Sequence, residues 1–173
     1  MARAICLRLL TGRAHSRGEL ETALSRRHVP PEAATAVLDR LATVGLVDDA
    51  AFAASWVSAR HAGRGLAGRA LAVELRARGI APETAGHALA ALDPATEEET
   101  ARRLVARRSA SLHGVPYEVR RRRLLGLLAR KGYAPALAGR AVRTVLAEGM
   151  LANGCGLGDD AEPALGEGYA DTR

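Results

Sequence analysis

Hydrophobic positions recur with helical spacing along most of the chain, most clearly between residues 71 and 92. Leu71 and Leu75 lie four residues apart, which places them on one face of a helix. Gly79 can end that helix in a left-handed conformation, and Pro82 suits the first turn of a following helix. The apolar residues after Pro82 again keep helical spacing. The stretch therefore predicts two helices joined by a tight turn.

The same helical pair occurs three times, with a period of about 50 residues. In each copy, two leucines four residues apart precede a basic residue, a turn residue and a proline. A helical pair repeated at this interval is typical of tandem units that stack on their neighbours. The matching positions are Leu20, Leu71 and Leu124; Leu24, Leu75 and Leu128; Arg27, Arg78 and Lys131; His28, Gly79 and Gly132; and Pro31, Pro82 and Pro135.

We predict an all-α fold of three tandem three-helix repeats that form an elongated, curved array, followed by a disordered C-terminal tail. The alternation of Val, Ile, Thr and Tyr that marks strands is absent from the sequence. Aromatic residues make up only 3% of the chain, so the core must consist mostly of Leu, Val and Ala. The predicted boundaries are 1–46, 47–93 and 94–148 for the repeats and 149–173 for the Gly-rich acidic tail.

Local signals predict where several helices begin and end. Ser16 begins a capping-box pattern for the second helix, and Thr96 begins another at the start of the third repeat. Asp48 or Asp49 can cap the first helix of the second repeat. The last helix is expected over residues 135–148, because glycines and acids without helical periodicity follow it.

The charge of the chain is divided between its body and its tail. The whole chain has a net charge of +6, but residues 149–173 contain five acids and one arginine. The body therefore carries a net charge of +10. A surplus of this size on about 148 residues is typical of a protein that binds a polyanion or an acidic partner.

The composition also indicates the cellular compartment in which the protein is expected. Cys6 and Cys155 are the two cysteines, which is too few for a disulfide framework or a cysteine metal site. No apolar run reaches the length of a membrane span, and the N-terminal residues lack the apolar stretch of a signal peptide. We therefore expect a cytoplasmic protein that does not associate with membranes.

The sequence contains no recognisable catalytic constellation. The five histidines are spread over the three predicted repeats and form no metal-binding pair, and most acids stand at predicted helix N-termini, where capping explains them. The glycine-rich stretch 62–68 lacks the Lys-Ser/Thr ending of a phosphate-binding P-loop. We expect no enzymatic activity, no cofactor and no metal.

Basic residues are the remaining candidates for function. If the repeats stack, bases at equivalent positions would form one extended stripe, which suits a helical polyanion or a nucleoprotein filament. Arginine contacts to phosphate would be salt-sensitive and blind to base sequence. The candidate binding residues are Arg26, Arg27, Arg76, Arg78, Arg103, Arg107, Arg120, Arg121, Arg122, Arg123, Arg130 and Lys131.

Four stretches resemble the RecX family, which regulates the RecA recombinase. They are SRGEL at 16–20, LDRLATVGLVDDAAFAASWV at 38–57, LAVELRARGI at 71–80 and RLLGLLARKGYAPAL at 123–137. The resemblance covers about residues 3–148, which is most of the chain.

The resemblance implies a partner of RecA, and we expect the protein to be a monomer. Members bind RecA and the groove of the RecA–DNA filament, usually inhibit its ATPase, strand-exchange and coprotease activities in DNA repair, and need no cofactor. Weak nonspecific DNA binding would accompany this role. Two alternatives remain: a direct DNA-binding protein that uses helix–turn–helix-like pairs, and a helical scaffold for another protein partner.

Overall fold

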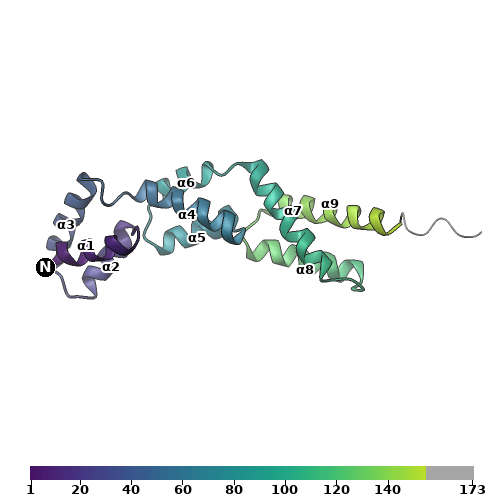
Figure 1. Ribbon diagram of the computed structural model, residues 1–173, viewed down its shortest axis with the longest axis horizontal. Helices are drawn as coiled ribbons and strands as arrows, with labels where there is room; N and C mark the ends of the chain where they lie inside the picture. The colour runs from purple at the N-terminus through teal and green to yellow at the C-terminus, as the bar shows by residue number, and fades with distance from the viewer. Residues whose placement is uncertain (155–173) are drawn as a thin grey trace, which may run out of the picture.

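The computed structural model describes residues 1–154, which form an elongated row of helices (Figure 1). This part of the chain contains no strand, and it divides into three consecutive three-helix repeats. The predicted all-α repeat fold is therefore confirmed. The helices are α1 (Ala2–Gly12), α2 (Arg17–Ser25) and α3 (Pro31–Thr43); α4 (Asp49–Arg64), α5 (Gly68–Ala77) and α6 (Pro82–Ala90); and α7 (Pro94–Ala110), α8 (Tyr117–Arg130) and α9 (Pro135–Gly154).

Each repeat folds around its own hydrophobic core. The six leucines of the repeated pattern are all fully buried, two in each core. Each buried leucine contributes about 1.5–3 kcal/mol by removing its apolar surface from water. All helix pairs in extensive contact lie within one repeat. Most of the stability therefore arises inside the repeats, while the junctions between repeats are narrow.

The turn between the second and third helices has the same backbone conformation in every repeat. Gly79 and Gly132 have positive φ angles of 74° and 86°, and His28 takes the same region with a φ angle of 55°. The following proline then begins the third helix in each repeat. This shared geometry explains why the turn residue and the proline recur together.

The helix caps agree with the sequence at two sites and differ at a third. The Ser16 hydroxyl accepts a hydrogen bond from the Glu19 amide at 3.1 Å, and the Asp48 carboxylate caps α4. The predicted cap at Thr96 is wrong, because α7 begins at Pro94 and Asp93 caps it. Proline is suited to the first helical position, so the helix starts two residues before Thr96 and the Asp93 carboxylate accepts from its amides.

The final helix is longer than predicted. Helix α9 runs to Gly154 and not to Glu148, although Gly149 lies within it. An interior glycine costs a helix about 1 kcal/mol relative to alanine, which does not stop a helix of this length from continuing into Met150 and Leu151, two residues of good helix propensity. The rest of the predicted disordered tail, residues 155–173, lies outside the described residues. No helix within residues 1–154 has both the length and the apolar character needed to span a bilayer.

Candidate functional site

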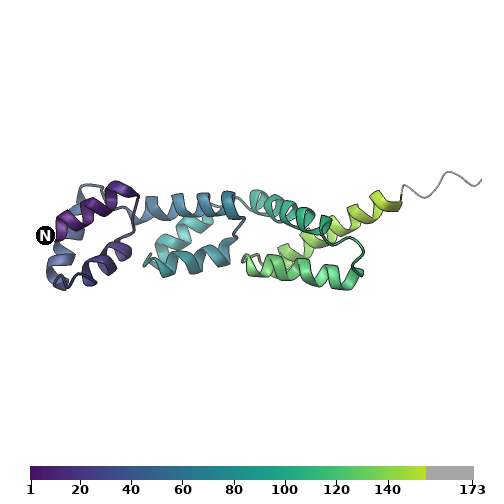
Figure 2. The same cartoon turned by 60° about the horizontal axis from the view of Figure 1, so that its bottom comes forward.

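The second helices of the three repeats lie end to end in one row, α8 to α5 to α2 (Figure 2). The Ser16 hydroxyl at the start of α2 donates to the Arg78 carbonyl at the end of α5, at 2.6 Å. The equivalent contact joins the Ala67 amide to the Lys131 carbonyl at 2.8 Å. Each junction thus places a helix C-terminus against a helix N-terminus, which aligns their dipoles favourably.

Both junctions require very close backbone approach. A Cβ atom on Gly18 would lie 2.8 Å from the Gly79 Cα atom. A Cβ atom on Gly132 would lie 2.3 Å from the Ala70 nitrogen. These glycines allow the end of one helix to touch the start of the next, so the turn glycine of the repeat pattern also sets the spacing between repeats.

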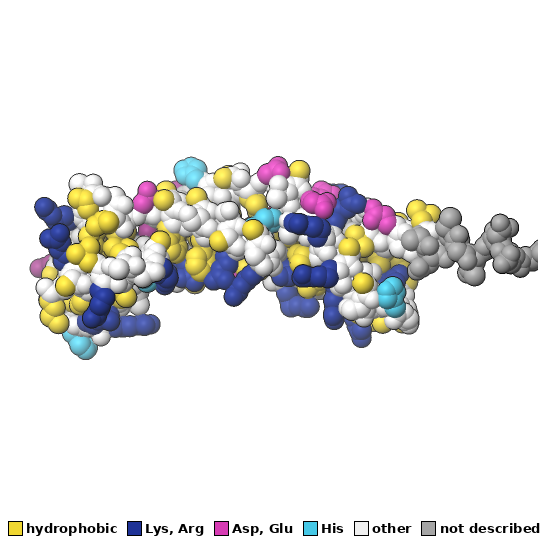
Figure 3. Space-filling model, viewed as in Figure 1, with side chains coloured by type: hydrophobic (Ala, Val, Ile, Leu, Met, Phe, Trp, Pro, Cys, Tyr) yellow, Lys and Arg dark blue, Asp and Glu magenta, His cyan; other side chains and the backbone are white. Residues whose placement is uncertain are grey.

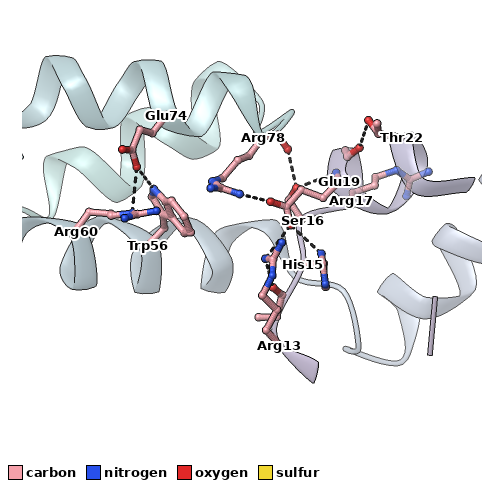
Figure 4. A network of polar contacts seen from close by, with 12 residues as sticks. Arg13, His15, Ser16, Arg17, Glu19, Thr22, Trp56, Arg60, Glu74 and Arg78 are labelled. Atoms are coloured by element: carbon pink, nitrogen blue, oxygen red, sulfur yellow. Dashed lines mark hydrogen bonds and ion pairs between the residues drawn. The ribbon is translucent and has the colours of Figure 1, made fainter. Parts of the chain in front are cut away.

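A cluster of polar side chains holds the first junction together (Figure 4). The Arg78 guanidinium forms an ion pair with Glu19 and lies 3.6 Å from the centre of the Trp56 ring. Arg60 approaches the same ring at 4.2 Å. The Trp56 ring nitrogen donates to Glu74 at 2.8 Å. This cluster links the first repeat, through Glu19, to the core edge of the second.

Glu19 is the centre of charge in this cluster. Its carboxylate accepts from Arg13 at 3.0 Å and lies 2.9 Å from the His15 Nδ1 atom, in addition to its pair with Arg78. Burial alone would raise the pKa of Glu19, but the hydrogen bond and charge of Arg13, the charge of Arg78 and the contact with His15 together hold it below its ordinary value. The folded protein therefore favours the ionised carboxylate.

The lowered pKa predicts that Glu19 contributes less stability in acid. Because the unfolded chain binds the proton more readily, the contribution is complete above the ordinary pKa of 4.5 and declines as the pH falls through the lower folded pKa. We expect Glu19→Gln to destabilise the protein at pH 7 and to destabilise it less at pH 3, as measured by urea unfolding. Glu21→Gln, at an exposed position of the same helix, is the control. A deficit that is equal at both pH values would contradict the expectation.

The second junction uses different residues at equivalent places. The Lys131 ammonium donates to the Arg64 carbonyl at 2.5 Å, near the C-terminus of α4. The buried Tyr133 hydroxyl donates to the Gly65 carbonyl at 3.1 Å. Burial, with a smaller effect from the charge of Glu97, raises the pKa of Tyr133 to about 12, so it remains a neutral donor. Lys131 and Arg78, at the same repeat position, thus both fasten neighbouring repeats.

The twelve predicted binding residues have different environments. Arg78 and Lys131 lie at the junctions and are partly covered, as is Arg120. Arg27 matches these two junction residues in the repeat, but it follows α2 at the free end of the row, where its side chain donates to the Ala23 carbonyl. The exposed candidates are Arg26, Arg27, Arg76, Arg103, Arg107, Arg121, Arg122, Arg123 and Arg130.

Basic side chains gather along one long edge of the molecule. Figure 3 shows Lys and Arg side chains along the edge formed by α5 and α8, and acidic side chains along the opposite edge near α7 and α9. Arg76 lies on α5 and Arg121, Arg122, Arg123 and Arg130 lie on α8, while Arg26 and Arg27 directly follow α2 and Arg103 and Arg107 lie on α7. The row of second helices therefore brings bases from three repeats onto one extended surface.

Sequence analysis did not single out Arg64, Glu19 or Glu74 as functional or junction residues. Arg64 lay in a stretch that reads only as a glycine-rich bend, and Glu19 was explained by helix capping. Their partners come from other repeats or other helices, so no local pattern reveals them. Within residues 1–154, no three His, Cys, Asp or Glu side chains are grouped so that they could hold a metal ion.

Comparison with known proteins identifies the family. Residues 2–41 match the description "RecX, first three-helix domain", and residues 48–89 match "RecX, second three-helix domain". Regulatory protein RecX of Thermobifida fusca (strain YX) is 59% identical over 150 residues, which cover 86% of this chain and 81% of that protein. The chain belongs to the RecX family. Regulatory protein RecX of Streptomyces coelicolor is 49% identical over 168 residues, covering 97% and 85% of the two chains.

Solved RecX structures share the fold. The crystal structure of RecX from Lactobacillus salivarius superposes with a TM-score of 0.79 at 16% identity, covering 84% of this chain and 95% of that one. A second crystal structure, of a regulatory protein RecX, gives a TM-score of 0.74 at 23% identity, covering 79% and 68%. The row of three-helix repeats is thus a fold that this chain shares with other RecX proteins.

Proposed function

We propose that the protein binds the RecA recombinase and the groove of the RecA–DNA filament, and that it lowers the ATPase, strand-exchange and coprotease activities of RecA. The observation that carries this proposal is the elongated basic edge along α2, α5 and α8 of a RecX-family chain. A long, narrow cationic surface is complementary to a long anionic groove. The protein would act as a cytoplasmic monomer without a cofactor or a catalytic step.

The binding energy would come mainly from the exposed arginines, while Arg78 and Lys131 keep the repeats aligned. Charge contacts of this kind steer association and weaken as salt screens them. A direct, sequence-reading DNA-binding role has less support, because α3 carries only Arg40 as a basic residue and α6 carries no Lys or Arg. A recognition helix needs side chains that reach base edges. A scaffold role for another partner would not require the basic edge.

The test is ATP hydrolysis by RecA on single-stranded DNA with substoichiometric amounts of this protein. We expect inhibition, and we expect Arg121→Gln/Arg122→Gln/Arg123→Gln to need about tenfold more protein for the same effect at low salt. Arg8→Gln/Arg40→Gln/Arg143→Gln removes the same charge from exposed positions elsewhere and serves as the control. If the unaltered protein leaves RecA hydrolysis unchanged, the proposal fails.

A further inference from the structure

The stacking of repeats creates two grooves in equivalent places. The first groove lies between the α1–α2 turn and α4, and the second lies between the α4–α5 turn and α7. Arg13 and Arg64 occupy equivalent positions in their repeats. Arg13 lies four residues before the start of α2, and Arg64 lies four residues before the start of α5. Ala53 of α4 and Ala101 of α7 are both completely buried and occupy equivalent positions, so the two helices can be aligned on them. Residues of the two grooves can therefore be compared one by one.

The two grooves differ in chemistry. In the first groove α4 contributes Ser55 and Ala59, whereas α7 places Arg103 and Arg107 at the equivalent positions of the second. Arg13 of the first groove pairs with Glu19 at 3.0 Å. The position equivalent to Glu19 is Ala70, so the second groove lacks this carboxylate.

Three arginines therefore share one hollow with no acidic residue in its lining, and the nearby Glu97 carboxylate accepts instead from the Gly68 amide. The second groove has a volume of about 260 Å³ and is lined by Arg64, Arg103 and Arg107. None of the three forms an ion pair within residues 1–154, and Arg103 donates only to the Thr100 hydroxyl at 3.0 Å. Like charges around one space repel each other. The first groove shows that a junction of this kind forms with Ser55 and Ala59, so packing does not require Arg103 and Arg107.

We infer that the second groove binds the phosphate backbone of single-stranded DNA. Guanidinium groups match phosphate oxygens in planar, two-point hydrogen bonds. Arg103 and Arg107 leave α7 from successive turns, about 5–6 Å apart, a spacing that consecutive phosphates of one strand can match. The base of the groove is apolar where Leu104 lies against Gly65, which strengthens charge contacts by limiting water. The inference rests on the proposed function in that DNA is part of the filament, but it concerns a contact that is measurable without RecA.

The experiment measures binding of fluorescein-labelled oligothymidylate to the full chain by fluorescence anisotropy over a range of salt, in the absence of RecA. We expect Arg64→Gln/Arg103→Gln/Arg107→Gln to weaken binding at least about tenfold at low salt, and to make the slope of log affinity against log salt shallower by about 2. The variant Arg8→Gln/Arg40→Gln/Arg143→Gln is the control for net charge. Circular dichroism and urea unfolding establish that both variants fold.

The outcomes separate this inference from the proposed function. A loss confined to the groove variant supports the inference, even if the unaltered protein has no effect on RecA. Equal losses in the groove variant and the control overturn it, and so does undetectable binding by the unaltered chain. If the groove variant keeps its affinity for DNA but loses inhibition of RecA, the groove contacts protein, and the inference fails while the proposed function stands.

Discussion

Replacing Gly132 by alanine is expected to destabilise the protein by about 2–5 kcal/mol. Two effects add at this position. The φ angle of 86° costs an L-residue about 1–2 kcal/mol, and the new Cβ atom would lie 2.3 Å from the Ala70 nitrogen. Relief of such a contact requires the backbone of α5 to move away from the end of α8, which costs about 1–3 kcal/mol more.

Gly114 provides a matched control for this substitution. Its φ angle is 76°, but a Cβ atom there would meet nothing within 4 Å. Gly114→Ala should therefore cost only the conformational part, about 1–2 kcal/mol. Urea unfolding followed by circular dichroism measures both variants. Equal losses at the two positions would mean that the close approach between α8 and α5 contributes nothing.

Replacing Arg78 by alanine should cost about 3 kcal/mol. The change leaves the carboxylate of Glu19, which is only 15% exposed, without its partner from the second repeat, and it removes a cation from the Trp56 face. A charge-assisted hydrogen bond is worth about 1.5–3 kcal/mol, and a partly desolvated cation–π contact about 1–2 kcal/mol. Since Trp56 is the only tryptophan of the chain, its fluorescence should also report the change directly.

Arg27 is the natural control, because it occupies the same position in the first repeat. It is exposed at the free end of the row, so Arg27→Ala should leave the free energy of unfolding unchanged within experimental error. If the two variants lost equal stability, Arg78 would act as an ordinary helix-end base and not as a fastener between repeats.

The fold was predictable because its signals are local. Leu71 and Leu75 indicate a helical face, Gly79 indicates a left-handed turn and Pro82 indicates a helix start, all within a dozen residues. The two errors in the predicted helix boundaries also have local causes. Helix α7 starts at Pro94 with Asp93 as its cap and not at Thr96, and α9 continues through Gly149 because a single interior glycine costs a helix only about 1 kcal/mol.

The candidate site was less predictable, because its residues are distinguished by contacts between repeats. Arg27, Arg78 and Lys131 look alike in sequence, yet only the last two meet a neighbouring repeat. Arg13 and Arg64 also match in the pattern, and their difference comes from Glu19 opposite one and Ala70 opposite the other. Charge alone made the arginines candidates for binding, but the stacking of the repeats determines which of them remain free to bind a ligand.

Three cores give the molecule two joints, and only at the second joint does a residue of one repeat, Ala67, enter the core of the next. Tilting at the first joint would break a few hydrogen bonds and ion pairs, whereas tilting at the second would also displace Ala67 and Tyr133, which are buried in the third core. A protein that binds along a helical polymer must match the pitch of that polymer, and a jointed molecule does so at a lower cost in free energy than a rigid one. Substitutions at the joints should therefore alter the fit to the polymer as well as the stability of the chain.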